Sequence, residues 1–299
     1  MTTTTTGDLH KIAVEECKDE LTDYTVYNKL ANRGKPAFRE AIRKISGMEM
    51  KHYDFWKKYC GDKINEIKVS RLIVNYVLLI RFVLGSSFAI KYLEKNERNT
   101  IKKYDSISHL IPSDDLPAFN EMVADEKEHE RSLAKEVEGS YLKYISFIVL
   151  GLADALVEIA GIHAGSLGIY NSTLITGLAG IIAGAAASIA MASAAFAQAK
   201  QGFEGSAGLS AFYTGFSYFI NAVILATPYF LTSDKYVAIT VSLTFGILII
   251  AFISYYNSIL SDEGFTRDFL QLAGIMLGAT AALYILGYVV RVVLHITIS

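Results

Sequence analysis

The stretch "EMVADEKEHERS" at residues 121–132 decides how the first half of the chain is expected to fold. It is almost wholly charged, yet it places Glu126 three residues before His129. Side chains at this spacing share one face of a helix, so the pair offers a metal ion one oxygen and one nitrogen ligand. The stretch "SGMEMKHYDFW" at residues 46–56 repeats the pattern. Two such pairs on separate helices indicate a metal site inside a helical bundle.

The second pair is Glu49 and His52, and two other predicted helices supply further carboxylates. These are Glu20 in "KDELTDYTVYNKLA" and the pair Glu94 and Glu97 in "KYLEKNERN". Two Glu-x-x-His helices joined by inward carboxylates from two more helices form the di-iron pattern of ferritin-like bundles. The alternative is a solvated charged face, and that is our interpretation of the remaining acids in the first stretch, namely Glu121, Asp125, Glu128 and Glu130.

Charge is divided unevenly along the 299-residue chain. Residues 1–140 hold 23 of the 28 Lys and Arg and 23 of the 30 Asp and Glu, which leaves five basic and seven acidic residues for 141–299. This division predicts a soluble domain over 1–140 and a membrane domain over 141–299. The net charge of -2 provides no basic surface for a phosphate backbone, so nucleic-acid binding is not expected.

The two cysteines, Cys17 and Cys60, are far apart in the sequence and form no C-x-x-C motif. This spacing argues against a disulfide scaffold, a zinc ribbon and a rubredoxin-type iron site. We expect both cysteines to be reduced and structural.

Apolar residues at helical spacing predict four helices in the soluble half. The third contains Arg71, Asn75 and Arg81 within its apolar part, and these residues would be costly in lipid. We therefore interpret it as a buried or interfacial helix and not as a membrane span. The four predicted helices cover residues 8–33, 37–59, 67–104 and 116–138.

The second half contains five apolar stretches, each near or above the ~20 residues that cross a bilayer. The N-terminal "MTTTTTGDLHK" lacks the apolar core of a signal peptide, and Lys200 and Arg267 are expected on the same side as the charged first domain. We therefore expect an integral membrane protein with a cytoplasmic soluble domain and its C-terminus on the opposite side. The predicted spans are 144–167, 173–199, 209–231, 236–259 and 269–296.

The first span carries two acids, Asp154 and Glu158, which are expensive in lipid unless they line a pathway. Asp154 lies ten residues into the span, or ~15 Å, about half of a ~30 Å hydrocarbon core, and Glu158 follows one turn later. Met191 in the second span is predicted at a similar depth, where its thioether is either a soft metal ligand or a packing residue. We predict a transport pathway along these three residues, and we expect His163 at the outer interface.

Residues 9–138 resemble the rubrerythrin branch of the ferritin-like superfamily, because the motifs above occur in that family's order and Tyr27 follows Glu20 by seven residues. The resemblance implies a di-iron site in which Glu97 is the extra carboxylate that rubrerythrins use. The rubredoxin-like electron-transfer module of many rubrerythrins is missing. The implied six-ligand set is Glu20, Glu49, His52, Glu94, Glu126 and His129.

Residues 143–296 resemble the vacuolar iron transporter family, a group with five membrane helices. "GLADAL" matches the family's Gly-x-x-Asp-Gly element and places Asp154 on its pathway aspartate, although Ala155 replaces the second glycine. "SIAMASAAFAQAK" matches the second-helix Ser-Met segment and places Met191 on the pathway methionine, although Ala195 stands where a glutamate is common. The resemblance implies a dimer that moves Fe(II), and in some members Mn(II), out of the cytoplasm.

The sequence thus predicts an all-α protein, with a ferritin-like four-helix bundle followed by a five-helix transmembrane domain. The expected function is export of Fe(II), with Mn(II) as a second candidate, by proton antiport through Asp154 and Glu158, while the iron-binding bundle collects or senses the metal. The expected partners are these ions, protons, the lipid bilayer and a second copy of the chain. The alternatives are a membrane-anchored di-iron oxidase or peroxide scavenger and a metal or oxygen sensor. A simple anchor would not need acids at mid-membrane depth, which favours transport.

Overall fold

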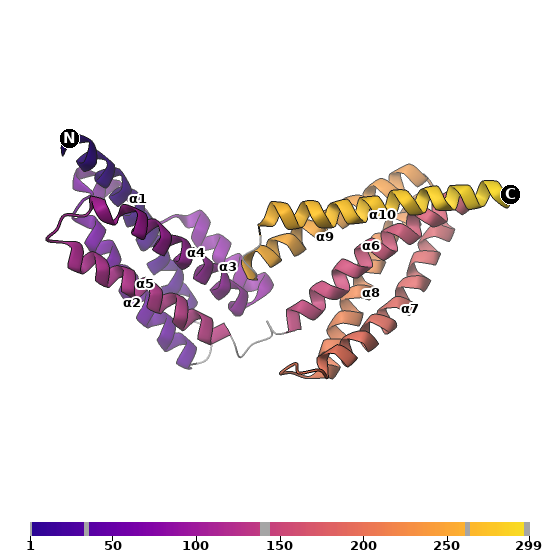
Figure 1. Cartoon of the computed structure of the whole chain (residues 1–299), viewed down its shortest axis with the longest axis horizontal. Coiled ribbons are helices and arrows are strands. Elements are labelled where there is room, and N and C mark those ends of the chain that lie inside the picture. The colour runs from indigo at the N-terminus through magenta and orange to yellow at the C-terminus, as the bar shows by residue number, and fades with distance from the viewer. Residues whose placement is uncertain (1, 33–35, 138–143, 261–263, 296–299) are drawn as a thin grey trace. The chain divides into compact units, whose positions relative to one another are not determined.

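The computed structural model describes residues 2–32, 36–137, 144–260 and 264–295, and these residues are helical with short connections and contain no β-strand (Figure 1). The predicted all-α class is therefore confirmed. The chain divides into two compact units, Met1–Leu142 and Lys143–Ser299.

Four long helices of the first unit pack in pairs: α1 lies along α2, α4 lies along α5, and α2 also contacts α5 (Figure 1). Pro36 begins α2 and Pro117 lies in the first turn of α5, where a missing N–H costs nothing. A shorter helix, α3, contacts α1 and α4. The helices are α1 Thr2–Leu30, α2 Pro36–Lys57, α3 Arg71–Leu84, α4 Ser86–Ile107 and α5 Leu116–Val137, with 3-10 turns at Gly61–Glu66 and Ser108–Leu110.

The single helix predicted over 67–104 is two helices in the structure. Gly85 separates α3 from α4 with a φ of 89°, a backbone conformation that residues with a Cβ rarely adopt. The first unit therefore has five α-helices in its described residues, one more than predicted. Helix α3 is amphipathic, with one face buried through Val74, Val77 and Ile80 and the other exposing Leu72, Leu79 and Phe82.

An aromatic core fills one part of the first unit. Trp56 of α2 meets Phe119 of α5 edge to face, with ring centroids 6.0 Å apart, and both side chains are buried. Tyr104 of α4 and Cys17 of α1 belong to the same cluster, so four helices contribute to it. Because Trp56 follows His52 by one helical turn, this core adjoins the predicted metal ligands.

The second unit consists of five helices that are each long and apolar enough to cross a membrane. Each of the five predicted spans is a helix of this kind, with ends shifted by a few residues. Helix α6 packs against α7, α8, α9 and α10, and α7 also packs along α8 (Figure 1). The helices are α6 Ile145–Tyr170, α7 Thr173–Ala199, α8 Ala207–Leu231, α9 Lys235–Leu260 and α10 Phe265–Val293.

Helices α6 and α8 approach closely at Gly151, where an added Cβ would lie 2.3 Å from the carbonyl oxygen of Thr214. Three side chains of α8 donate hydrogen bonds to α6 carbonyls beside this contact. Thr214 bonds Phe147 at 3.0 Å, and Ser217 and Asn221 bond the carbonyls of Ile148 and Leu152 at 3.1 Å and 2.8 Å. Small residues and interhelical hydrogen bonds of this kind hold helices together in lipid.

We predict that Gly151→Ala separates α6 from α8, because the new methyl group would overlap the α8 backbone. The free energy of unfolding should fall by about 1–3 kcal/mol, the usual cost of overpacking. The matched control is Gly274→Ala in α10, where an added Cβ meets nothing within 4 Å. Thermal unfolding of both variants in detergent tests this, and equal midpoints would contradict the proposed close contact.

Candidate metal centre and membrane acids

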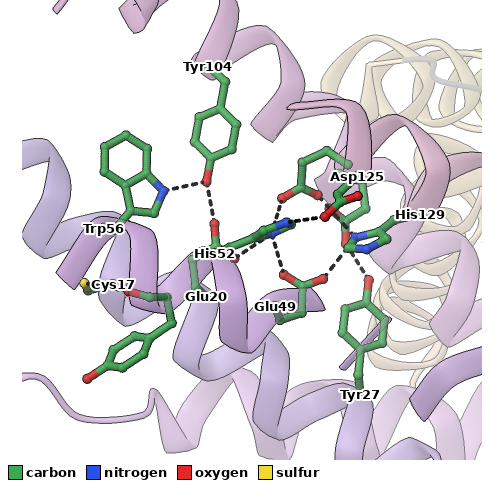
Figure 2. A network of polar contacts seen from close by, with 12 residues as sticks. Cys17, Glu20, Tyr27, Glu49, His52, Trp56, Tyr104, Asp125 and His129 are labelled. Carbon is green, nitrogen blue, oxygen red and sulfur yellow. Dashed lines mark hydrogen bonds and ion pairs between the residues drawn. The ribbon is translucent and has the colours of Figure 1, made fainter. Parts of the chain in front are cut away.

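Six buried carboxylate and imidazole side chains from four helices converge inside the first unit (Figure 2). Their donor atoms form two groups, and within each group the atoms lie within 4.8 Å of one another. Glu49 and Glu126 belong to both groups, so the arrangement suits two neighbouring metal ions bridged by two carboxylates. The first group is Glu20, Glu49, His52 and Glu126, and the second is Glu49, Glu97, Glu126 and His129.

The two Glu-x-x-His pairs face each other and are cross-paired. His52 Nδ1 of α2 lies 3.0 Å from Glu126 Oε1 of α5, and His129 Nδ1 lies 3.1 Å from Glu49 Oε1. The two imidazole rings are 5.7 Å apart between centroids. Each histidine therefore contacts the glutamate of the opposite helix, as expected when two i, i+3 pairs project into one interface.

The structure brings six of the seven predicted ligands together and leaves Glu94 outside both groups. Its carboxylate oxygens lie 2.9 Å and 2.7 Å from Nζ of Lys91, one turn earlier on α4. Glu97, predicted as the extra carboxylate, occupies a place in the second group instead. The pairing with Lys91 explains why Glu94 stays outside both groups, because the lysine neutralises the Glu94 charge without a metal ion.

Bound protons offset the negative charge of the buried carboxylates when no metal ion is present. Burial raises the pKa of Glu20 and of Glu97 well above the ordinary glutamate value. Burial lowers the pKa of a histidine, but in His52 the close contacts with the carboxylates of Glu126 and Glu20 outweigh burial and raise the pKa far above its usual range. In His129 the contacts with Glu126 and Glu49 likewise outweigh burial and raise the pKa to about 9. Both imidazoles are therefore protonated at neutral pH in the metal-free centre.

The chemistry of these residues fits a metal ion. Carboxylates and imidazoles suit Fe(II) and Mn(II), and a buried charged cluster is otherwise costly. Nδ1 of His129, the ring nitrogen that faces the carboxylates of Glu49 and Glu126, is buried and makes no well-formed hydrogen bond in the described part of the chain. An unpaired polar atom in such a position is unusual in folded proteins and is explained if the nitrogen is a metal ligand.

Two tyrosines hold ligand carboxylates in a crossed arrangement (Figure 2). Tyr27 of α1 donates a hydrogen bond to Glu97 of α4, and Tyr104 of α4 donates one to Glu20 of α1. We did not identify Tyr104 from the sequence. A signal was present, because Tyr104 follows Glu97 by seven residues, as Tyr27 follows Glu20.

Asp125 was interpreted as part of a solvated face, but in the structure it turns towards the centre (Figure 2). Its Oδ2 lies 3.6 Å from Nε2 of His52, and its side chain is 22% exposed. The neighbouring acid Glu128 does face solvent, where it pairs with Lys44 at 2.7 Å. Asp125 precedes the ligand Glu126 directly and sits at the edge of the helix face that carries the centre, which explains its orientation.

The acids of α6 lie beside α8. The hydroxyl of Tyr218 donates a 2.6 Å hydrogen bond to Oε2 of Glu158. Asp154 is partly buried, whereas Glu158 is exposed on the isolated chain. Met191 of α7 packs against the apolar cluster that contains Leu156 and Tyr218. The sequence analysis missed Tyr218, because one tyrosine in an apolar helix gives no local signal.

His163, expected at the outer interface, is buried between helices. Its side chain is 1% exposed, and its ring centroid lies 4.4 Å from that of Tyr229 on α8. On α7 it faces Gly180, whose lack of a side chain leaves room for the imidazole. The expectation was wrong because a position near a helix end does not reveal which neighbouring helices cover it.

No known family model, curated protein or solved structure matches this chain. Two features of the chain bear on its function. One is the buried carboxylate and histidine centre of the first unit, and the other is the pair of acids on the first membrane-length helix.

We predict that replacing both His52 and His129 with Ala abolishes metal binding, since each group then loses its nitrogen ligand. The wild-type chain should bind about two metal ions, because two carboxylates are shared between the groups. The control is His109→Ala, at an exposed position outside the centre. Elemental analysis of the purified full chains measures the metal content, and an unchanged content in the double variant would contradict this assignment.

We also predict that metal binding releases protons and strengthens as pH rises. The pKa of His129 in the metal-free centre is about 9, so at pH 7 its imidazole must lose a proton before it binds a metal ion. Each proton displaced should weaken apparent affinity about tenfold per unit of falling pH in this range. Calorimetry in buffers of different ionisation enthalpy measures the release, and metal binding without proton release would contradict the prediction.

Proposed function

We propose that the protein is an integral membrane exporter of Fe(II), with Mn(II) as a second cargo, that works by proton antiport and carries a di-iron centre in its first unit. The observation that supports this best is the presence, in one chain, of a buried carboxylate and histidine cluster that could hold two ions and of acids within a membrane-length helix. The resemblances to ferritin-like proteins and to vacuolar iron transporters, both drawn from short motifs, support the same proposal.

The ligand chemistry supports iron at the centre. The two groups offer only carboxylate oxygens and imidazole nitrogens, and neither includes a cysteine, the ligand typical of structural zinc and of Fe–S clusters. Two carboxylates shared by both groups suit a pair of like ions held close together. Iron bound there would supply one-electron redox chemistry. The protein contributes the ligands, and Tyr27 and Tyr104 orient two of the carboxylates.

The acids of α6 support transport. Ionisable residues within membrane helices usually line a water-filled path or face a partner. Glu158 is exposed on the single chain, so a second copy or a water-filled pathway would have to cover it, which supports a homodimer. Carboxylates that release a metal ion can take up protons, so Asp154 and Glu158 would couple export to proton entry.

The order of the two units suggests how they cooperate. Helix α5 ends at Val137 and α6 begins at Ile145, so a short segment tethers the centre to the membrane unit. A tethered site that binds Fe(II) raises its effective concentration for transport. We propose that the first unit lies in the cytoplasm and collects or senses the metal there.

A second function, that of a membrane-anchored di-iron oxidase or peroxide scavenger, is favoured by one observation. Trp56 donates a hydrogen bond to Tyr104, and Tyr104 donates to the ligand Glu20, so aromatic side chains connect directly to the centre. Aromatic groups in this position suit electron transfer to or from bound iron. Transport remains the main proposal, because an anchor does not require the acids of α6.

We predict that Asp154→Asn lowers proton-driven Fe(II) uptake into proteoliposomes at least about tenfold, because the amide cannot exchange a proton. Iron content of the first unit should not change, since the two sites share no residue. The matched control is Asp234→Asn, because Asp234 accepts hydrogen bonds from the first turn of α9 and asparagine caps a helix equally well. Transport by Asp154→Asn at the wild-type rate would make the oxidase the better proposal.

A further inference from the structure

The only two cysteines of the chain meet beside the metal centre, although 43 positions separate them. Cys17 lies on α1 and Cys60 just after α2, and both are fully buried. Their sulfur atoms are 3.0 Å apart, and each Sγ also contacts a backbone oxygen, Cys60 that of Ala13 and Cys17 that of Tyr53. Two thiols in this contact can form a disulfide with a small movement.

A continuous set of contacts joins this pair to a ligand of the centre, and Figure 2 shows its part from Trp56 through Tyr104 to Glu20. Sγ of Cys60 lies 3.5 Å from the carbonyl oxygen of Trp56, whose indole N–H donates a 3.1 Å hydrogen bond to the hydroxyl of Tyr104. Tyr104 in turn donates to Glu20. On α1, Cys17 precedes Glu20 by three residues, or ~4.5 Å along the helix axis. Both thiols are therefore linked to the Glu20 carboxylate, Cys60 through Trp56 and Tyr104, and Cys17 along α1.

The thiols themselves do not belong to either ligand group, so metal binding does not explain their position. Burial raises the pKa of the Cys17 thiol, and the neighbouring Cys60 and Glu20 raise it further. Only thiolates attack peroxides and disulfides efficiently, so this buried thiol is poorly suited to react with an oxidant directly. A route through the aromatic side chains to the centre avoids this difficulty.

We propose that Cys17 and Cys60 form a redox-active dithiol that reduces the metal centre and becomes an intrachain disulfide. This inference depends on the proposed di-iron centre and adds its electron donor. The chain has no C-x-x-C site of the rubredoxin type, so the dithiol provides an internal source of electrons. It also returns the metal to the Fe(II) state that the proposed transport requires.

The electron count of the step balances. Forming one S–S bond from two thiols releases two protons and two electrons, and two electrons reduce two Fe(III) to two Fe(II). With hydrogen peroxide as the oxidant, two Fe(II) and two protons would convert one peroxide to two waters and leave two Fe(III). The sum is one dithiol and one peroxide giving one disulfide and two waters. The two-electron capacity of the cysteine pair thus matches a two-ion centre.

The test uses the full chain in detergent, loaded with Fe(II) without oxygen and given one equivalent of hydrogen peroxide per centre. Alkylation and mass spectrometry then count the free thiols, and iron content is measured on the same samples. The wild type should lose both thiols and yield a Cys17–Cys60 disulfide. The chain has no other cysteine, so the thiol count reports this pair alone.

Five variants, including Tyr24→Phe as a control, isolate the route. In Cys17→Ser, and in Cys60→Ala as a second version, iron should bind normally but its Fe(III) absorption should persist at least tenfold longer. Compared at equal measured iron content, Tyr104→Phe should lose thiols at least tenfold more slowly than the wild type, whereas Tyr24→Phe, outside the set of contacts, should behave as wild type. The metal-free His52→Ala and His129→Ala double variant should keep both thiols.

Two results would overturn the proposal. One is oxidation of the bound iron while both thiols remain free. The other is equally fast thiol loss in the metal-free double variant, which would show direct reaction with peroxide. If the wild type binds no iron, the di-iron centre itself is wrong and the dithiol loses its role. The iron measurement distinguishes this failure from the other two.

Discussion

The first unit depends on the burial of four carboxylates and two imidazoles between its helices. Buried charges are costly unless opposite charges or metal ions compensate them. Here the compensation comes from crossed pairs, His52 with Glu126 and His129 with Glu49, and from protons where no metal is bound. These pairs require α2 and α5 to face each other at one register.

Helices α1 and α4 are tied together by a second set of crossed contacts. Tyr27 bonds Glu97, and Tyr104 bonds Glu20, so each helix supplies one carboxylate and the tyrosine that orients the other. Such hydrogen bonds fix the geometry of metal ligands and adjust their basicity. On one side the arrangement continues into Trp56, so the centre and the aromatic core form one connected network.

A different constraint applies to the membrane-length helices, because polar groups have few hydrogen-bond partners in lipid. Ser, Thr and Asn side chains of α8 bond carbonyls of α6, and Gly151 lets the two backbones approach. Glu158 remains exposed on the single chain and bonds only Tyr218 among the described residues. Packing of the helices alone does not require an acid in this setting.

The sequence by itself determined the all-helical class, the five membrane-length helices and the presence of two Glu-x-x-His pairs, because these features follow from local periodicity and composition. Tertiary structure decided that Glu97 joins the cluster while Glu94 pairs with a lysine, since both lie on one helix and only packing distinguishes them. It also decided the break at Gly85 and the meeting of Cys17 with Cys60. These features depend on backbone conformation and on contacts between helices, which residue spacing along one helix does not specify.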